Sequence, residues 1–341
     1  MTDTNQSNIA KTKLPDFRRL LKNYQQPDFK RSLWQVLNSY IPYIALLTAM
    51  YFSLNFSYWL TLLLAIPAGG FMVRIFIICH DCGHGSFLKS KKARDFLGFI
   101  SGLIAFVPYK QWRHSHAIHH ATCGNLDRRG LGDVWTMTVE EYLSSTFWRR
   151  LGYRLYRNPY IMFTVGPLYA FLIGQRFSDK GAKRREKNAV LFTNLTLLGI
   201  VILMYFTIGI KAYLMIQIPV LFFASIAGVW LFYIQHQYED VYWERNEAWD
   251  FDAAALQGSS FYNLPGILRW FSGNIGFHHV HHLNSRIPNY YLEKCHDIIT
   301  QHVEIKPINM RKSLKSLKYR LWDDKNYRMV GFGALKKLAM A

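Results

Sequence analysis

The sequence predicts an all-α integral membrane protein, in which four transmembrane helices form two hairpins and carry a helical cap on the cytoplasmic side. Half of the 341 residues are hydrophobic, whereas 18% are charged, which is unusual for a soluble protein. The apolar residues gather in long runs, as membrane spans require. Basic residues flank these runs, which is typical of cytoplasmic loops. We expect a basic arm over residues 1–35 and one membrane domain over residues 36–341.

The first predicted hairpin joins an apolar run over about residues 40–54 to a second run over about residues 58–78. The link, Asn55-Phe56-Ser57, is uncharged and too short for a domain, so a helix that crosses the bilayer and returns explains the pattern. Arg74 lies near the end of the second run and can reach the interface with its guanidinium. Four basic residues follow and predict the cytoplasmic side: Lys89, Lys91, Lys92 and Arg94.

The second predicted hairpin comprises residues 189–210 and 213–234, joined near Lys211. A strongly basic loop over residues 176–187 precedes it and predicts that the hairpin starts in the cytoplasm. Two hairpins return the chain to one side. We therefore expect both termini, the cap after residue 235 and all the histidine clusters described below on the cytoplasmic side.

Two further apolar segments, residues 96–108 and residues 161–174, are shorter than the ~20 residues of a membrane span. A single crossing at residues 96–108 would place the histidines before and after it on opposite sides. We expect both segments to be interfacial or re-entrant. Four aromatic residues of the cap are expected to cover the site or anchor at the interface: Trp243, Trp249, Trp270 and Phe271.

Charge and cysteine content exclude several classes of function. The formal net charge is +19, but the basic residues adjoin apolar runs and no nucleic-acid motif accompanies them, so we expect an anionic leaflet and no nucleic-acid partner. Cys79 and Cys82 have no second pair to complete a zinc ribbon, and Cys123 and Cys295 stand alone. We expect reduced thiols and no secretory signal peptide.

Histidines are concentrated in four places, which hold 11 of the 13 when His114 is included. Spacings of three and four residues place side chains on one helix face, and the clusters follow these spacings. The nine that we expect to meet at one site are His80, His84, His116, His119, His120, His236, His278, His281 and His282. His114 and His279 are off these spacings, and His296 and His302 stand outside the clusters.

Nine imidazoles are too many for one metal ion but fit two ions with four or five ligands each. Imidazole suits Zn, Cu, Fe and Ni, so ligand type does not name the metal. A metal pair at the mouth of a membrane bundle would meet lipid tails, for which oxygen activation by iron is the chemistry expected. Ligand histidines donate their other N–H to an acceptor; the candidates are Asp81, Asp127, Asp133, Glu239, Asp240 and Asn274, with Asp81 favoured by its place inside the first cluster.

The three clusters resemble the histidine boxes of the membrane fatty acid desaturases. These boxes read HDCGH at residues 80–84, HAIHH at residues 116–120 and HHVHH at residues 278–282. The flanks GNLDRRGLGDVWTMTVEEY and LNSRIPNY resemble the acyl-lipid Δ12/ω-6-type branch, and IQHQYED around His236 resembles that branch's additional histidine. The resemblance covers roughly residues 35–300.

The resemblance implies a di-iron centre that uses O2 and two electrons to place a cis double bond in an acyl chain, with water as the other product. The chain carries no fused haem domain and no Gly-rich nucleotide fingerprint. A separate donor, of the ferredoxin or cytochrome b5 type, is therefore expected to bring the electrons. Arg176, Lys183 and Arg184 could form part of its docking surface.

Two other functions are compatible with parts of the pattern. A membrane hydroxylase of alkanes or carotenoids would use the same boxes, and the flanking sequences favour a desaturase over it. A metal transporter or other non-enzymatic metal-binding membrane protein would place polar ligands inside its spans, whereas these histidines gather at one end. The sequence leaves open the chain length, the double-bond position, the oligomeric state and whether the acyl group is carried by a glycerolipid, CoA or a carrier protein.

Overall fold

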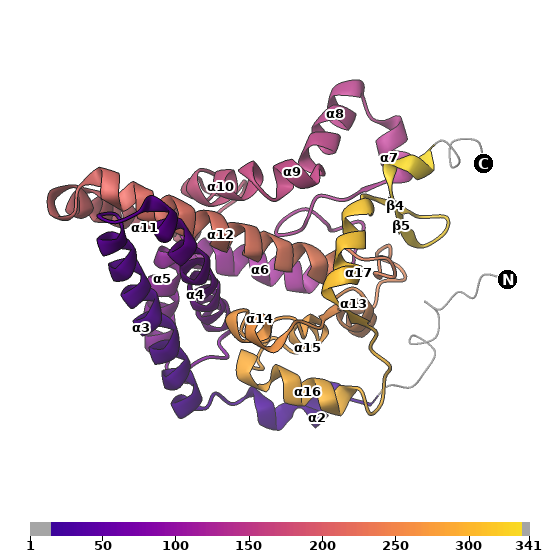
Figure 1. Ribbon diagram of the computed structural model, residues 1–341. Helices are drawn as coiled ribbons and strands as arrows, with labels where there is room; N and C mark the ends of the chain where they lie inside the picture. The colour runs from indigo at the N-terminus through magenta and orange to yellow at the C-terminus, as the bar shows by residue number, and fades with distance from the viewer. Residues whose placement is uncertain (1–14, 336–341) are drawn as a thin grey trace.

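Four long helices dominate the computed structural model, which describes residues 15–335 (Figure 1). All four are long and apolar enough to cross a membrane, as the sequence predicts: α3 (Phe29–Ser53), α4 (Tyr58–His84), α11 (Arg184–Thr207) and α12 (Ile210–His236). Short links join α3 to α4 and α11 to α12. Helix α4 is central, because it packs against α3, α12 and α5 (Lys91–Ile104).

All four helices extend beyond the apolar runs that predict them, and α11 does so at its start, which is Arg184 rather than Ala189. Helix α3 begins at Phe29 rather than near Tyr40, and α4 continues to His84. The added turns of α3 bury Ser32 and Gln35. The hydroxyl of Ser32 donates to the carbonyl of Phe87 after α4, and the amide oxygen of Gln35 accepts from Asn289 of the cap. A search for apolar runs cannot find such turns, because their buried face is polar. The extension of α4 to His84 and of α12 to His236 makes these histidines the last residues of their helices.

The two shorter apolar segments form no span within the described residues. The first is α5 followed by a tight turn at Phe106, whose φ is 61°, and α6 (Tyr109–Thr122) then runs back along it. Gly98 makes this approach possible, because a Cβ at that position would lie 2.5 Å from the ring of Tyr109. The second segment is divided between α9 (Pro159–Met162) and α10 (Val165–Leu172). Their depth in a bilayer stays a prediction.

The remaining chain forms short elements around the ends of the long helices. The helices are α2 (Phe17–Leu20), α7 (Val139–Ser144), α8 (Phe147–Tyr156), α13 (Phe251–Gln257), α14 (Gly266–Phe271), α15 (His278–Leu283), α16 (Leu292–Ile299) and α17 (Met310–Lys315). Single 3-10 turns lie at Lys22–Gln25, Gly174–Arg176, Asn289–Tyr291, Ser316–Lys318 and Phe332–Ala334.

This part of the molecule also contains two small β-sheets, which the prediction of a helical cap did not include. Strand β1 (Met137–Thr138) pairs in parallel with β4 (Leu321–Asp323), which pairs antiparallel with β5 (Arg328–Val330). Strands β2 (Phe261–Tyr262) and β3 (Pro307–Ile308) form a second, parallel pair. Strands of two or three residues are too short to give an alternating pattern in the sequence, so only the tertiary contacts define them.

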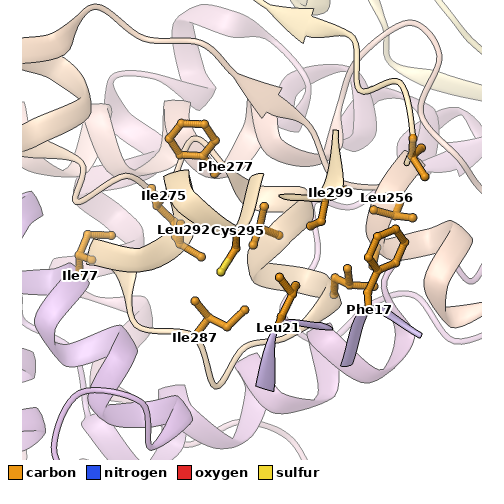
Figure 2. Close-up of a cluster of buried hydrophobic side chains, with 14 residues drawn as sticks. Phe17, Leu21, Ile77, Leu256, Ile275, Phe277, Ile287, Leu292, Cys295 and Ile299 are labelled. Atoms are coloured by element: carbon orange, nitrogen blue, oxygen red, sulfur yellow. The ribbon is translucent and has the colours of Figure 1, made fainter. Parts of the chain in front are cut away.

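Helix α15, which carries the third histidine cluster, contributes Val280 and Leu283 to a hydrophobic core. Figure 2 shows this core, to which several short elements contribute. Phe17 and Leu21 come from the N-terminal arm, Leu292 and Cys295 from α16, and Val280 from α15 itself; all five are buried. Burial of each large apolar side chain contributes about 1.5–3 kcal/mol. The described part of the predicted arm is therefore packed beneath α15, whereas residues 1–14 lie outside the described residues.

Candidate metal centre

Four helices bring all nine predicted histidines together in two groups. Within each group the ligand atoms lie within 4.8 Å of one another. The first group holds five histidines: His80, His84, His116, His120 and His281. The second group holds four: His119, His236, His278 and His282. Each group therefore has the number of imidazoles expected for one of two metal ions.

The two H-x-x-H-H clusters divide between these groups in opposite ways. On α6, His116 and His120 point to the first group and His119 to the second. On α15, His281 belongs to the first group, whereas His278 and His282 belong to the second. Residues four apart lie about 40° apart around a helix, whereas adjacent residues lie about 100° apart, so the third histidine of each cluster faces the neighbouring group. Both helices thus contribute to both groups, which keeps the two positions adjacent.

The nitrogen atoms within each group face one another. His281 Nε2 lies 3.0 Å from His120 Nε2, which lies 3.2 Å from the Nε2 of His116. In the second group, His236 Nε2 lies 3.1 Å from His119 Nε2 and 3.0 Å from His278 Nε2. The Nε2 atoms of three further histidines are buried without a hydrogen-bond partner: His80, His84 and His282. Such a set of lone pairs suits a cation in each group.

The protonation state of the cluster also suits metal binding. Burial, reinforced by neighbouring imidazoles, holds the pKa well below its usual range for five of the histidines: His116, His120, His278, His281 and His282. These imidazoles are therefore neutral at physiological pH. Neutral imidazole is the form that coordinates metals, so the residues present fit a pair of bound ions.

Three hydrogen bonds orient one histidine each on α4, α6 and α12. Asp81 Oδ1 lies 2.9 Å from His80 Nδ1, and Asp133 Oδ1 lies 2.5 Å from His119 Nδ1. The carbonyl of Gly258 lies 3.1 Å from His236 Nδ1. An acceptor at Nδ1 places the proton there and leaves Nε2 free for a metal. Two of the candidate partners named from the sequence, Asp81 and Asp133, thus lie at the Nδ1 atom of a histidine.

The other predicted partners lie farther away. Glu239 and Asp240 are exposed, and Glu239 interacts with the hydroxyl of Tyr319. Asp127 accepts hydrogen bonds from Arg245 and from the backbone of residue 246. Asn274 donates to the carbonyl of Asn289, 3.2 Å away. The carbonyl of Asn274 also accepts from the backbone N–H of Phe277, directly before His278. Neither the side chain of Asn274 nor that of Glu239 hydrogen-bonds a histidine among the described residues.

The histidines set apart by the sequence lie outside both groups. His279 is buried, and its Nε2 lies 2.9 Å from the Nδ1 of His296. His114 is exposed, and His302 packs edge-on against Phe17. The five-residue box at 278–282 therefore contributes three of its four histidines, as its spacing predicts.

Several residues of the site escape sequence reasoning. The backbone and side-chain N–H groups of Asn289 both donate to Asp81 Oδ2, each at 2.8 Å. Trp112 stacks on His116 with ring centroids 4.5 Å apart, and Cys123 Sγ lies 3.3 Å from His236 Nδ1. Phe232 packs against two ligands of the second group. Asn289 belongs to the LNSRIPNY flank, but its distance of 208 residues from Asp81 hides the contact.

Four candidate membrane spans lead to two neighbouring histidine groups, each of which could hold a metal ion. A sequence model described as fatty acid desaturase matches residues 57–312. The match includes all nine histidines of the two groups. The chain belongs to the fatty acid desaturase family.

Relatives with assigned names agree with this membership. A "Fatty acid desaturase" of Bacillus subtilis is 47% identical over 93% of this chain and 90% of its own length. An "sn-1 acyl-lipid omega-3 desaturase (ferredoxin)" of Synechocystis is 30% identical over 66% of this chain and 63% of its own length. An "sn-1 oleoyl-lipid 12-desaturase" of the same organism is 23% identical over 86% of this chain and 83% of its own length.

Proposed function

We propose that this chain introduces a cis double bond into the acyl chain of a membrane lipid, using O2 and two electrons at a histidine-ligated di-iron centre. The observation that carries the proposal is the division of nine buried or half-buried histidines into two groups, each of a size that suits one metal ion, at the end of four apolar helices. Membership of the desaturase family supports the reaction class. The names of the relatives support a lipid-bound acyl chain.

The five-histidine and four-histidine groups would each hold one iron. Iron bound there would supply the oxidising power that removes hydrogen from two neighbouring methylene carbons of the acyl chain, while O2 and two electrons are consumed and water forms. The chain itself contributes a site that is dry, neutral and rigid. Histidines at helix ends have less rotational freedom when their Nδ1 atoms are tied, as those of His80, His119 and His236 are.

Aromatic side chains limit the access of water to the two groups. Trp112 covers His116 and His80 on one side, and Phe232 covers His119 and His236 on the other. A site from which water is excluded strengthens the electrostatic interactions inside it and suppresses side reactions of the bound oxidant. The apolar rings also suit an alkyl substrate.

A separate electron donor of the ferredoxin or cytochrome b5 type would reduce the centre, and two relatives carry "(ferredoxin)" in their names. The basic loop at residues 176–187 supports an acidic donor. Lys183 and Arg184 are exposed in it. Arg176 is half-buried, because its guanidinium donates to Asn194 and to the carbonyl of Phe106. Charge reversal at Lys183 and Arg184 is therefore a cleaner test of docking than charge reversal at Arg176.

We place the active site and both termini on the cytoplasmic side. Basic residues support this orientation, since the four that follow α4 and the loop before α11 adjoin the histidine-bearing ends of the spans. In the two-hairpin arrangement the chain crosses the membrane an even number of times between the arm and the cap, so the arm and the cap lie on the same side. This placement would give a soluble electron donor direct access to the centre.

Expression in a host without polyunsaturated lipids tests the reaction. New double bonds in the fatty-acid profile, located by fragmentation, are the expected result. Hydroxylated chains without an alkene would instead indicate the hydroxylase reaction. An unchanged profile from protein that contains iron, in the presence of an active electron donor, would contradict both.

Substitution of His281 by Ala tests the convergence of the boxes. His281 belongs to the five-histidine group, so His281→Ala should remove about one of two bound metals and reduce turnover by at least about a hundredfold. His302→Ala is the matched control, because His302 is exposed and lies outside both groups. Metal analysis of the purified proteins measures the outcome, and full metal content in His281→Ala would contradict the assignment.

A further inference from the structure

A half-open pocket of about 430 Å³ lies between α3, α4 and the cap, outside both histidine groups. Its charged lining consists of three arginines and one carboxylate: Arg31, Arg74, Arg269 and Glu293. The remaining lining includes two tryptophans and several side-chain amides. The reaction proposed above does not involve this pocket. Its excess of positive charge favours binding of an anionic ligand.

Arg74 is the most informative residue of the pocket. It is 7% exposed, and it donates to the carbonyl of Trp270 and lies 3.4 Å from Asn38 Oδ1. Its guanidinium also lies 3.9 Å from the centre of the Trp270 ring. No carboxylate pairs with it among residues 15–335. A buried cation without an anionic partner is costly, and an anion in the pocket would remove that cost.

A buried amide also lacks a partner in the same pocket. Gln35 is 3% exposed, and its Nε2 donates to no acceptor. Its Oε1 accepts from Asn289 Nδ2 at 3.0 Å, so the side chain is held in place with one donor left over. An unmade buried hydrogen bond costs ~1–3 kcal/mol. Gln35 and Arg74 together would be satisfied by a ligand that accepts several hydrogen bonds and carries negative charge.

The other two arginines are only partly neutralised. Arg269 Nη1 lies 2.5 Å from Glu293 Oε1. Arg31 Nε lies 3.9 Å from Asp28 Oδ2, which is close to the upper limit for an ion pair. Three guanidinium groups around one pocket with a single lining carboxylate fit a phosphate group, because guanidinium groups form strong charge-assisted hydrogen bonds to phosphate oxygens.

Apolar side chains around the pocket indicate where the phosphate comes from. Trp34 and Trp270 line the pocket and are 66% and 39% exposed, and Ile267, which follows the lining residue Gly266, is 69% exposed. Tryptophans at this position mark the level of lipid headgroups in membrane proteins. Helices α3 and α4, which line the pocket, are candidate spans. A phosphate bound here would therefore have lipid tails beside it.

We propose that this pocket binds the phosphate of a membrane phospholipid, with Arg74 and Gln35 as its buried donors and Arg31 and Arg269 at its rim. The pocket also adjoins the metal centre. Asn289 lines it and donates to Asp81, whose other oxygen holds His80. A lipid in the pocket would thus be positioned beside the first histidine group.

Calorimetric titration of the full-length protein in neutral detergent tests the proposal. The probes are dihexanoyl phosphatidylglycerol, dihexanoylglycerol and inorganic phosphate. The phospholipid should bind at least tenfold more tightly than either of the others. Arg74→Gln should raise its Kd at least about tenfold, since a charge-assisted bond in a buried position is lost. Glu293→Gln should lower the Kd by about twofold to fivefold, because it releases Arg269.

If Arg74→Gln does not fold, two surface variants still test the proposal, because they are expected to change the Kd in opposite directions. Arg31→Gln should weaken binding by about twofold to fivefold, while Glu293→Gln strengthens it. Arg311→Gln, an exposed arginine outside the pocket, should leave the Kd unchanged. Equal affinity for inorganic phosphate would indicate a site for the free ion, and equal affinity for dihexanoylglycerol would indicate apolar contact alone. Either result, or identical Kd values in all variants, would overturn the proposal.

Discussion

At the scale of single residues, the acceptors at Nδ1 decide what each imidazole can do. A neutral imidazole carries one proton, and the ring nitrogen without it is the ligand atom. Asp133 fixes the tautomer of His119 through a 2.5 Å contact, in a part of the site where both side chains are buried. Asp81 does the same for His80 and is itself held by two N–H groups of Asn289.

Asp133→Asn should lower the affinity of the four-histidine group for metal by about 10–100-fold, because the amide no longer provides a charged acceptor. Metal titration of the purified protein measures the change. Asp127→Asn is the matched control, since Asp127 pairs with Arg245 away from both groups. Equal losses in the two variants would mean that Asp133 acts through the loop rather than through His119.

At the scale of elements, the close approach of α4 and α12 places the first histidine box beside His236. Gly69 makes this approach possible. A Cβ at residue 69 would lie 2.9 Å from the Cβ of Phe223 and 3.0 Å from the backbone nitrogen of Ala224. Small residues at such contacts are the usual means by which membrane helices pack closely. Both helices end in histidines of the two groups, so a change in the spacing of the helices also changes the distances between these histidines.

Gly69→Ala should therefore destabilise the protein by about 1–3 kcal/mol relative to Gly228→Ala. Gly228 lies on α12 with no atom within 4 Å of an added Cβ, so that variant gains helix propensity without a clash. Thermal unfolding in detergent, followed by circular dichroism, compares the two. A Gly69→Ala variant as stable as Gly228→Ala would show that α4 and α12 are farther apart than described.

At the scale of the whole molecule, every histidine of the two groups lies at or beyond the same ends of α4 and α12, where the cap closes over them (Figure 1). The orientation proposed above makes that end cytoplasmic. The four cysteines are buried, which gives a low background for thiol labelling. Exposed positions exist at both ends, at Asn55 between α3 and α4 and at Ser178 before α11.

A membrane-impermeant maleimide applied to intact cells should label Asn55→Cys and spare Ser178→Cys until the membrane is opened. The reagent reaches only the outer side, and the two positions are expected on opposite sides of the bilayer. Gel-shift detection of the labelled chain measures the fraction modified, at least about tenfold higher for Asn55→Cys. The reverse pattern would place the histidines outside, and labelling of both would contradict the hairpin arrangement.

The four candidate spans and the nine histidines that come together can be predicted from the sequence alone. Hydrophobic run length and a spacing of three and four residues are local properties, so they can be read without coordinates. The same holds for Asp81, which is adjacent to its histidine, and the spacing also separated His279 from its neighbours. Asp133 lies 14 residues from His119. The sequence therefore identifies it only as one of several carboxylates that follow the second histidine box.

Tertiary structure alone decided which histidine serves which group, and which distant residues support them. The H-x-x-H-H clusters have identical spacing, yet α6 and α15 divide their histidines in opposite ways, because the division depends on how each helix is rotated against its neighbours. Asn289 on Asp81 and the pocket around Arg74 likewise arise from residues hundreds of positions apart. Such contacts depend on chain packing, which leaves no periodic signal in the sequence.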